Sequence, residues 1–232
     1  MIRAATSLRP PYGGPARRSF EIDLPRGALR EYLIASHVAA VAVAIVPTGQ
    51  CRVVATRDPG RTLVALRREF HGIELASIFW VESPEMARLI ATEVSLPRVK
   101  DERGLMEGPA SQLVRAIEAT AARMNISLTE HAVVMRRVRS AVHLVKTKIA
   151  EAQARGELGW FNKAYREWRL EAKKVGRVMS YAEAQARLRR AAVVRALSGD
   201  FTDAGIEMLP AIFPKLPTPT ADQRKATQRP SN

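Results

Sequence analysis

The stretch Val41–Leu66, VAVAIVPTGQCRVVATRDPGRTLVAL, decides which fold the sequence predicts. Val41–Val46 and Cys51–Ala55 are two runs rich in valine, a residue that favours strands. Gly49 can supply the positive φ of a tight turn between them, and Pro47 ends the first run. The stretch therefore predicts a β-hairpin.

The residues after the hairpin predict a helix, a third strand and a second helix. Asp58 can cap a helix that holds Pro59 in its first turn, where a missing N–H costs nothing. Ile73–Val81 is an apolar run of strand length. Ser83 and Pro84 are the cap and first residue of a further helix. These elements form a small ββαβα layer at the N-terminal side of the chain.

The second half of the sequence is helical. Ser111–Met124 has apolar residues on one face, and Trp160–Lys174 is a further amphipathic segment. Ser127–Glu130 and Ser180–Glu183 both match the S-x-x-E capping box, so each predicts the start of a helix. We therefore expect an α+β fold, with the ββαβα layer followed by a basic all-helical C-terminal domain.

Changes in composition divide the chain into five predicted segments. They are a flexible basic N-terminal arm (1–26), the α+β domain (27–96), a linker rich in proline and glycine (97–109), the basic helical domain (110–199) and an extended tail that contains prolines (200–232).

The composition indicates a sizeable core and a strong positive charge. The chain has 232 residues, of which 47% are hydrophobic. Its formal net charge of +14 favours a polyanionic partner. Cys51 is the only cysteine, which excludes an intrachain disulfide and a cysteine-rich zinc site. We find no secretory signal and no apolar run long enough to cross a bilayer, so we expect a soluble cytoplasmic protein without a membrane partner.

Two segments, Arg52–Leu63 (RVVATRDPGRTL) and Phe79–Leu89 (FWVESPEMARL), carry a resemblance to a known family. Over about 41–96 the chain resembles the GIY-YIG nuclease domain, in its divergent branch. In that family a hairpin, helix, strand and helix follow at this spacing, and paired tyrosines, an arginine and a metal-binding glutamate carry the hydrolysis. A generic α+β layer with a chance Asp-Pro turn is the alternative interpretation.

The positions of this catalytic set hold other residues here. The first tyrosine has no counterpart. The second tyrosine, the motif glycine, the arginine and the glutamate fall on Arg52, Val54, Thr62 and Ala91. Alanine cannot hold the divalent ion that activates water, so the resemblance implies a catalytically degenerate domain without a cofactor. Mg²⁺ is expected only if the displaced Arg61 and Glu93 restore a nuclease.

Basic residues on the predicted helices are the candidate nucleic-acid contacts. Arg136, Arg139, His143 and Lys146 fall at spacings of three, four and three, so they share one helix face. The full set of candidates is Arg136, Arg137, Arg139, Lys146, Lys148, Lys163, Arg166, Arg169, Lys173, Lys174, Arg187 and Arg190. Core packing between helices is the default role of the aromatic cluster among them, and stacking on bases is the alternative; the cluster is Trp160, Phe161, Tyr165 and Trp168. The four histidines match no metal-ligand motif, so no metal site is predicted.

Three functions follow from these patterns. The first is a nucleic-acid-binding protein, with DNA expected before RNA, on a degenerate GIY-YIG-like scaffold with basic helices. The second is a metal-dependent endonuclease that uses Arg61 and Glu93. The third is a helical scaffold that packs on a protein partner or on a second copy of the chain. The missing catalytic set favours a protein that is not an enzyme.

Overall fold

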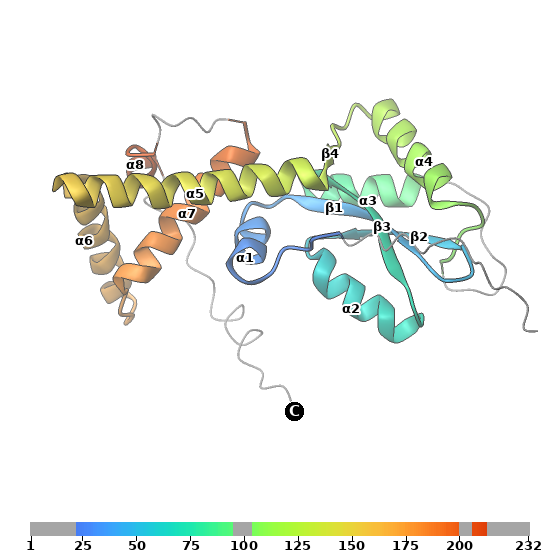
Figure 1. Cartoon of the computed structure of the whole chain (residues 1–232), viewed down its shortest axis with the longest axis horizontal. Helices are drawn as coiled ribbons and strands as arrows, with labels where there is room; N and C mark the ends of the chain where they lie inside the picture. Colours follow the sequence, from blue (N-terminus) through green and yellow to red (C-terminus); the bar gives the residue numbers. More distant parts are fainter. Residues whose placement is uncertain (1–21, 95–103, 200–205, 213–232) are drawn as a thin grey trace, which may run out of the picture.

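The computed structural model describes residues 22–94, 104–199 and 206–212 (Figure 1). Its elements follow in the order α1 Gly27–Ala35, β1 Ala39–Ile45, β2 Cys51–Thr56, α2 Pro59–Glu69, β3 Glu74–Val81, α3 Pro84–Glu93, α4 Ala110–Arg123, β4 Thr129–Glu130, α5 His131–Arg155, α6 Gly159–Lys174, α7 Tyr181–Leu197 and α8 Leu209–Ile212. The fold is therefore a mixture of helices with one sheet.

The sheet is antiparallel throughout, with the strand order β2-β1-β3-β4. The predicted hairpin is confirmed, since β1 pairs with β2 from Ala40 opposite Thr56 to Ile45 opposite Cys51. Gly49 has a φ of 88° in the turn, a value that suits glycine because it has no Cβ. The hairpin places β1 at the centre of the sheet, between β2 and β3.

Both faces of β1 are buried, so the sheet carries two apolar layers. Ala40, Ala42 and Ala44 belong to one core together with apolar residues of α1, α2, α5 and α7. Val41 and Val43 point the other way, into a core that apolar residues of α3 and α4 complete. Figure 1 shows α2 and α3 on opposite sides of the sheet.

Three predicted helix starts are confirmed by their caps. The Arg61 backbone N–H donates to Asp58 Oδ1 at 3.1 Å, and the Met86 N–H donates to Ser83 Oγ at 3.3 Å. At the start of α7, the Glu183 N–H donates to Ser180 Oγ at 3.2 Å, while the Ser180 N–H donates to Glu183 Oε2 at 2.6 Å. This pair is the capping box that the sequence predicted.

The capping box predicted at Ser127–Glu130 is wrong. Residues Thr129 and Glu130 instead form β4, where Trp80 pairs with Thr129 and Phe79 with Glu130. A capping box needs its glutamate inside the helix, but Glu130 is extended (φ −60°, ψ 145°) because it pairs with β3. Consequently α5 begins at His131 without a side-chain cap.

Part of the segment predicted as a linker is packed. Leu105 and Met106 are buried, and Met106 exchanges two backbone hydrogen bonds with Cys51 at the free edge of β2. The next helix, α4, lies against α3 and the sheet through Leu113 and Ile117. Residues 97–103 of the linker, 1–21 of the arm, and 200–205 and 213–232 of the tail lie outside the described residues.

The longest helix, α5, joins the sheet to the later helices. Its 25 residues span about 38 Å. It contacts β3 and packs along α7, and Val138 and Val145 are fully buried in the core it shares with the sheet. Gly156 ends it in the left-handed region, with a φ of 72°.

Candidate nucleic-acid interface

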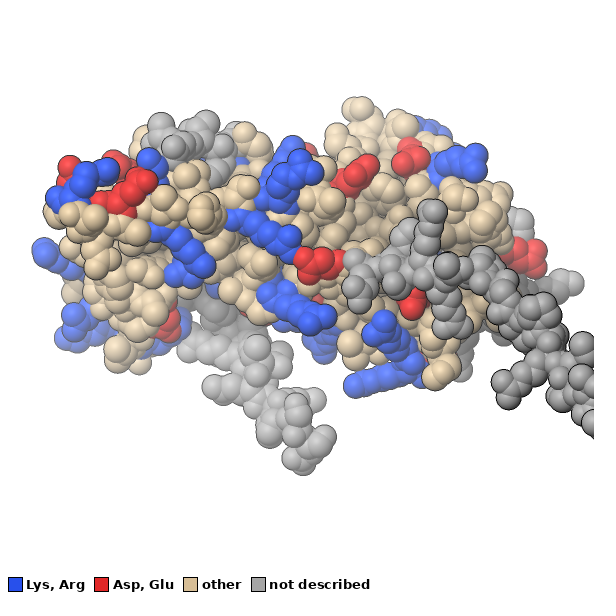
Figure 2. All heavy atoms as spheres, in the orientation of Figure 1, with Lys and Arg blue, Asp and Glu red and all other residues tan. Residues whose placement is uncertain are grey.

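The outer face of α5 carries the basic row that the spacing predicted. Arg136, Arg139, His143 and Lys146 are exposed, whereas Val138 and Val145 on the opposite side of the helix are buried. In Figure 2 blue side chains lie along α5 and continue over α1 and α2. The helix therefore uses one face for the core and presents the other to solvent as a line of cations.

Most of these cations are not neutralised by a neighbour. Arg139 forms an ion pair with the Asp23 carboxylate, and Lys148 lies 3.7 Å from Glu151. No ion pair involves Arg136, Arg137 or Lys146 within the part of the chain that the structure describes. Because exposed ion pairs are weak, even Arg139 can exchange Asp23 for another anion at little cost.

His131 fixes the segment 22–25 against the start of α5. The Trp80 Nε1–H donates to His131 Nδ1 at 3.0 Å, so the ring hydrogen lies on Nε2. This Nε2–H donates to the Asp23 carbonyl oxygen at 3.0 Å. Together with the Arg139–Asp23 ion pair, these bonds hold Asp23 beside the basic row.

A cleft opens where the same segment passes between α1 and α2. It has a volume of about 750 Å³. Its charged lining consists of Arg26, Arg30, Arg61, Arg67, Asp58 and Glu74. Its apolar wall includes Ile22, Leu24, Leu63, Val64 and Leu75. We call this feature the arginine cleft.

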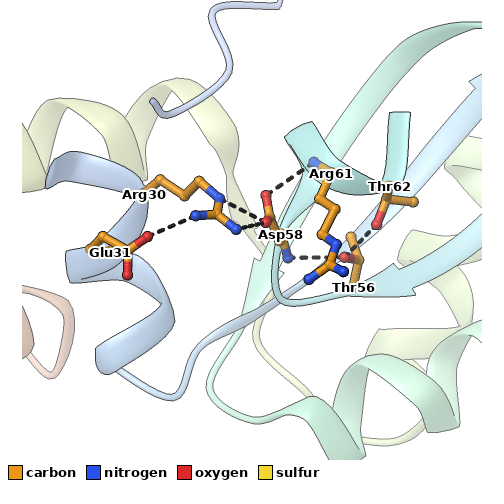
Figure 3. Close-up of polar contacts among 6 residues, drawn as sticks. All are labelled: Arg30, Glu31, Thr56, Asp58, Arg61 and Thr62. Atoms are coloured by element: carbon orange, nitrogen blue, oxygen red, sulfur yellow. Dashed lines mark hydrogen bonds and ion pairs between the residues drawn. The ribbon is translucent and has the colours of Figure 1, made fainter. Parts of the chain in front are cut away.

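Asp58 organises one side of the arginine cleft (Figure 3). Its Oδ2 accepts a hydrogen bond from Arg30 Nε at 2.7 Å and lies 2.5 Å from Arg30 Nη2, while its Oδ1 caps α2. Burial raises the pKa of Asp58, but the hydrogen bonds from Arg30 and from the Arg61 backbone outweigh it, so the pKa lies below its usual value. Asp58 therefore stays ionised and holds Arg30 in place.

The four positions compared with the nuclease motif hold side chains that are engaged elsewhere or are apolar. Thr62 Oγ1 lies 2.7 Å from Thr56 Oγ1, so its hydroxyl is bound within the β2–α2 turn. Figure 3 shows the two side chains facing each other. Arg52 pairs with Glu69 at 3.1 Å and lies over the Phe70 ring. The remaining two positions, Val54 and Ala91, are half-buried and offer no polar side chain.

The displaced candidates Arg61 and Glu93 lie apart. Arg61 is on α2 and lines the arginine cleft. Glu93 is on α3, which covers the other face of the sheet, and it lies 3.8 Å from Arg123 of α4. Among the described residues, no three His, Cys, Asp or Glu side chains gather closely enough to hold a metal ion.

The candidates on α6 and α7 fall into two groups. Lys163, Arg166, Arg169, Lys173 and Lys174 are exposed on α6. Arg187 and Arg190 are half-buried on α7. The Arg187 guanidinium lies over the Trp168 ring at 4.7 Å and pairs with Glu171, and burial lowers its pKa. Arg187 is thus part of the packing between α6 and α7.

The aromatic residues of α6 have the core role that their spacing predicted. Phe161 is fully buried and Trp168 nearly so. Phe161 meets the Tyr181 ring edge-on, with ring centres 5.1 Å apart. These contacts join α6 to the start of α7, so the two side chains are not open to stacking by bases.

Sequence reasoning missed the arginine cleft. Arg26 and Arg30 precede the hairpin and Arg67 follows it, so no single sequence pattern groups these three arginines as candidates. The only local signal was the run of arginines on the predicted helix after Asp58. Their meeting depends on the contacts of the segment 22–27, which no local pattern predicts.

Comparison with known proteins adds no relative to this description. No family model, no curated protein and no solved structure matches the chain. Within the described ranges, no helix is both long and apolar enough to span a membrane.

Proposed function

We propose that this protein binds the phosphate backbone of a nucleic acid through α5, with DNA as the expected partner, and that it does not cut it. The observation that carries the proposal is the exposed basic face of α5 opposite its buried valines. Lysine and arginine that neutralise phosphates release condensed counterions, which is the main source of affinity without sequence preference.

The dimensions of α5 agree with this use. Its length of about 38 Å is close to one turn of B-form DNA, roughly 34–36 Å. Arg136 and Lys146 are ten residues apart on the same face, so they can reach phosphates about 15 Å apart along a groove edge. The formal net charge of the whole chain, +14, attracts a polyanion at long range.

The scaffold supports binding without hydrolysis. The order of β1, β2, α2, β3 and α3 is the one that the GIY-YIG resemblance implies. On that scaffold, Thr62 and Ala91 replace the arginine and the glutamate, and Arg61 and Glu93 lie on opposite sides of the sheet. We therefore expect no cleavage of plasmid, linear or branched DNA with Mg²⁺ or Mn²⁺. Cleavage that Glu93→Ala abolishes would contradict this assignment.

The test is the salt dependence of binding, measured by fluorescence anisotropy on duplexes of about 20 base pairs, roughly two turns. The triple variant Arg136→Gln, Arg139→Gln, Lys146→Gln should flatten the slope of log affinity against log salt by about two to three units, since each phosphate contributes roughly 0.9. The slope should flatten by the same amount for two unrelated DNA sequences, because phosphate contacts do not read bases. A parallel series with RNA duplexes tests the preference for DNA.

The matched control removes the same charge elsewhere. Arg88, Arg115 and Arg123 are exposed on α3 and α4, which cover the other face of the sheet. The variant Arg88→Gln, Arg115→Gln, Arg123→Gln has the same net charge as the first and should keep the wild-type slope. Equal slopes for the two variants would mean that net charge alone, and not α5, drives binding, and would overturn the proposal.

A further inference from the structure

We infer that the arginine cleft binds one unpaired, phosphate-bearing nucleotide of the strand that lies along α5. This inference rests on the proposed function, because α5 supplies the main contact with the strand. None of the positions that match the nuclease motif, Arg52, Val54, Thr62 and Ala91, lines the cleft. Of the two displaced candidates, Arg61 lines the cleft and Glu93 does not.

The charges of the cleft favour an anion. Four arginines line it against two acids, Asp58 and Glu74. Asp58 is already engaged by Arg30 and by the α2 backbone. The side chains of Arg26 and Arg61 form no hydrogen bond or ion pair with any other described residue. The guanidinium groups of Arg26 and Arg61 are therefore available to a ligand, and the oxygens of one phosphate can accept hydrogen bonds from both.

Part of this lining is already fixed before a ligand arrives. Arg30 is held by Asp58, and Arg67 Nε donates to the Ile73 carbonyl oxygen at 3.4 Å. Groups that are held in place lose less freedom when an anion binds, so they contribute more to affinity. The cleft therefore combines anchored arginines with two that can close on a phosphate.

The size and the wall of the cleft favour a nucleotide over a bare phosphate. A volume of about 750 Å³ lies within the range of small-molecule sites, roughly 300–1,000 Å³. Leu63 and Leu75 are buried in the wall, and Val64 is 54% exposed there. Apolar side chains and guanidinium planes can cover the face of any base, so no base preference is expected.

The position of the cleft favours a nucleotide that belongs to a bound strand. The segment 22–27 lines the cleft, and its residue Asp23 is bound to His131 and Arg139 at the start of α5. A duplex backbone on α5 therefore passes close to the opening. A paired base cannot leave the duplex without the loss of stacking, whereas a single-stranded end can enter freely.

The experiment compares a blunt duplex with the same duplex carrying a short single-stranded overhang. We expect wild-type protein to bind the overhang DNA about tenfold more tightly, roughly the contribution of one charged hydrogen bond. Arg26→Gln, Arg61→Gln should remove this preference while leaving binding to the blunt duplex unchanged. The control Arg68→Gln, Arg88→Gln, which removes two exposed arginines outside the cleft, should keep the preference.

A second variant tests the same surface by another route. Val64→Glu places a carboxylate on the exposed wall of the cleft and should also abolish the overhang preference, with an unchanged thermal unfolding temperature. Equal affinity of wild-type protein for blunt and overhang DNA would overturn the inference.

The outcomes separate this inference from the proposed function. If the wild-type protein shows no overhang preference but a normal α5 salt slope, only the inference about the cleft is overturned, whereas failure of the wild-type protein to bind either DNA overturns both. Titration with a 5′-mononucleotide tests the other source of the same chemistry. Saturable binding that Arg26→Gln, Arg61→Gln abolishes, without any overhang preference, would overturn the assignment to a bound strand.

Discussion

At the scale of single residues, Asp58 joins two parts of the chain. Its carboxylate caps α2 and binds Arg30 of α1. Asp58→Ala removes the cap and leaves the half-buried Arg30 guanidinium with its Glu31 contact but without Asp58, so we expect the free energy of unfolding to fall by about 1–2 kcal/mol in urea denaturation. Asp58→Asn keeps a cap and should cost less. Equal losses for the two variants would mean that the cap contributes nothing.

The same carboxylate makes the stability of the fold depend on pH. Because the pKa of Asp58 is lowered in the folded protein, folding is favoured by its ionised form. This stabilisation is complete above the ordinary pKa of an aspartate, about 3.9, and is lost as the pH falls through the lowered value. The difference in unfolding free energy between wild type and Asp58→Asn should therefore be constant near neutral pH and shrink in acid.

At the scale of elements, Ser127 and Ser180 have the same sequence pattern and different roles. Ser180 caps α7, so Ser180→Ala should lower the free energy of unfolding by about 1 kcal/mol. Ser127 is exposed and caps nothing, so Ser127→Ala should change it by less than about 0.5 kcal/mol. Chemical denaturation of the two variants side by side checks this; a larger loss at Ser127 would contradict the β4 pairing.

This pair also marks how far the sequence predicts the fold. The caps at Asp58, Ser83 and Ser180 are complete within four residues, so their chemistry is visible locally. The same local pattern at Ser127 forms no cap, because Thr129 pairs with Trp80 of β3, about 50 residues earlier in the chain. The hairpin was predictable because its two strands are adjacent and its turn is specific.

The candidate site, too, can be predicted from the sequence only in part. The basic face of α5 follows from helical spacing, since every residue in it belongs to one helix. The arginine cleft does not, because it needs Arg26 and Arg61 to meet across a tertiary contact. Likewise, the spacing of Arg187 predicts a helix face but cannot show that Trp168 covers its guanidinium.

At the scale of the whole molecule, one core joins the sheet to the C-terminal helices. Ala40 of β1, Val138 of α5 and Leu188 of α7 belong to the same apolar cluster. Leu188→Ala leaves a cavity there and should lower the free energy of unfolding by about 2–5 kcal/mol. Hydrogen exchange should then speed up in β1 and β3 as well as in α5 and α7, because they share this cluster.

The control for this prediction lies in the other layer. Ile117 of α4 packs on the opposite face of the sheet. Ile117→Ala should cost a similar free energy, and its local openings should be concentrated in α3 and α4. If Leu188→Ala leaves exchange in the strands unchanged, the helices and the sheet unfold independently, and the shared cluster does not couple them.

The shared cluster also sets the order in which the newly made chain can bury its surfaces. The face of the sheet that holds Val41 and Val43 meets α3 and α4, which are synthesised soon after β3. The face that holds Ala40 and Trp80 is covered first by α1, α2 and α5, and it is completed only by Leu188 of α7, 108 residues after Trp80. At about 5–20 residues per second, this face stays incompletely covered for roughly ten seconds. Slow translation between α5 and α7 would therefore promote aggregation through strands made long before.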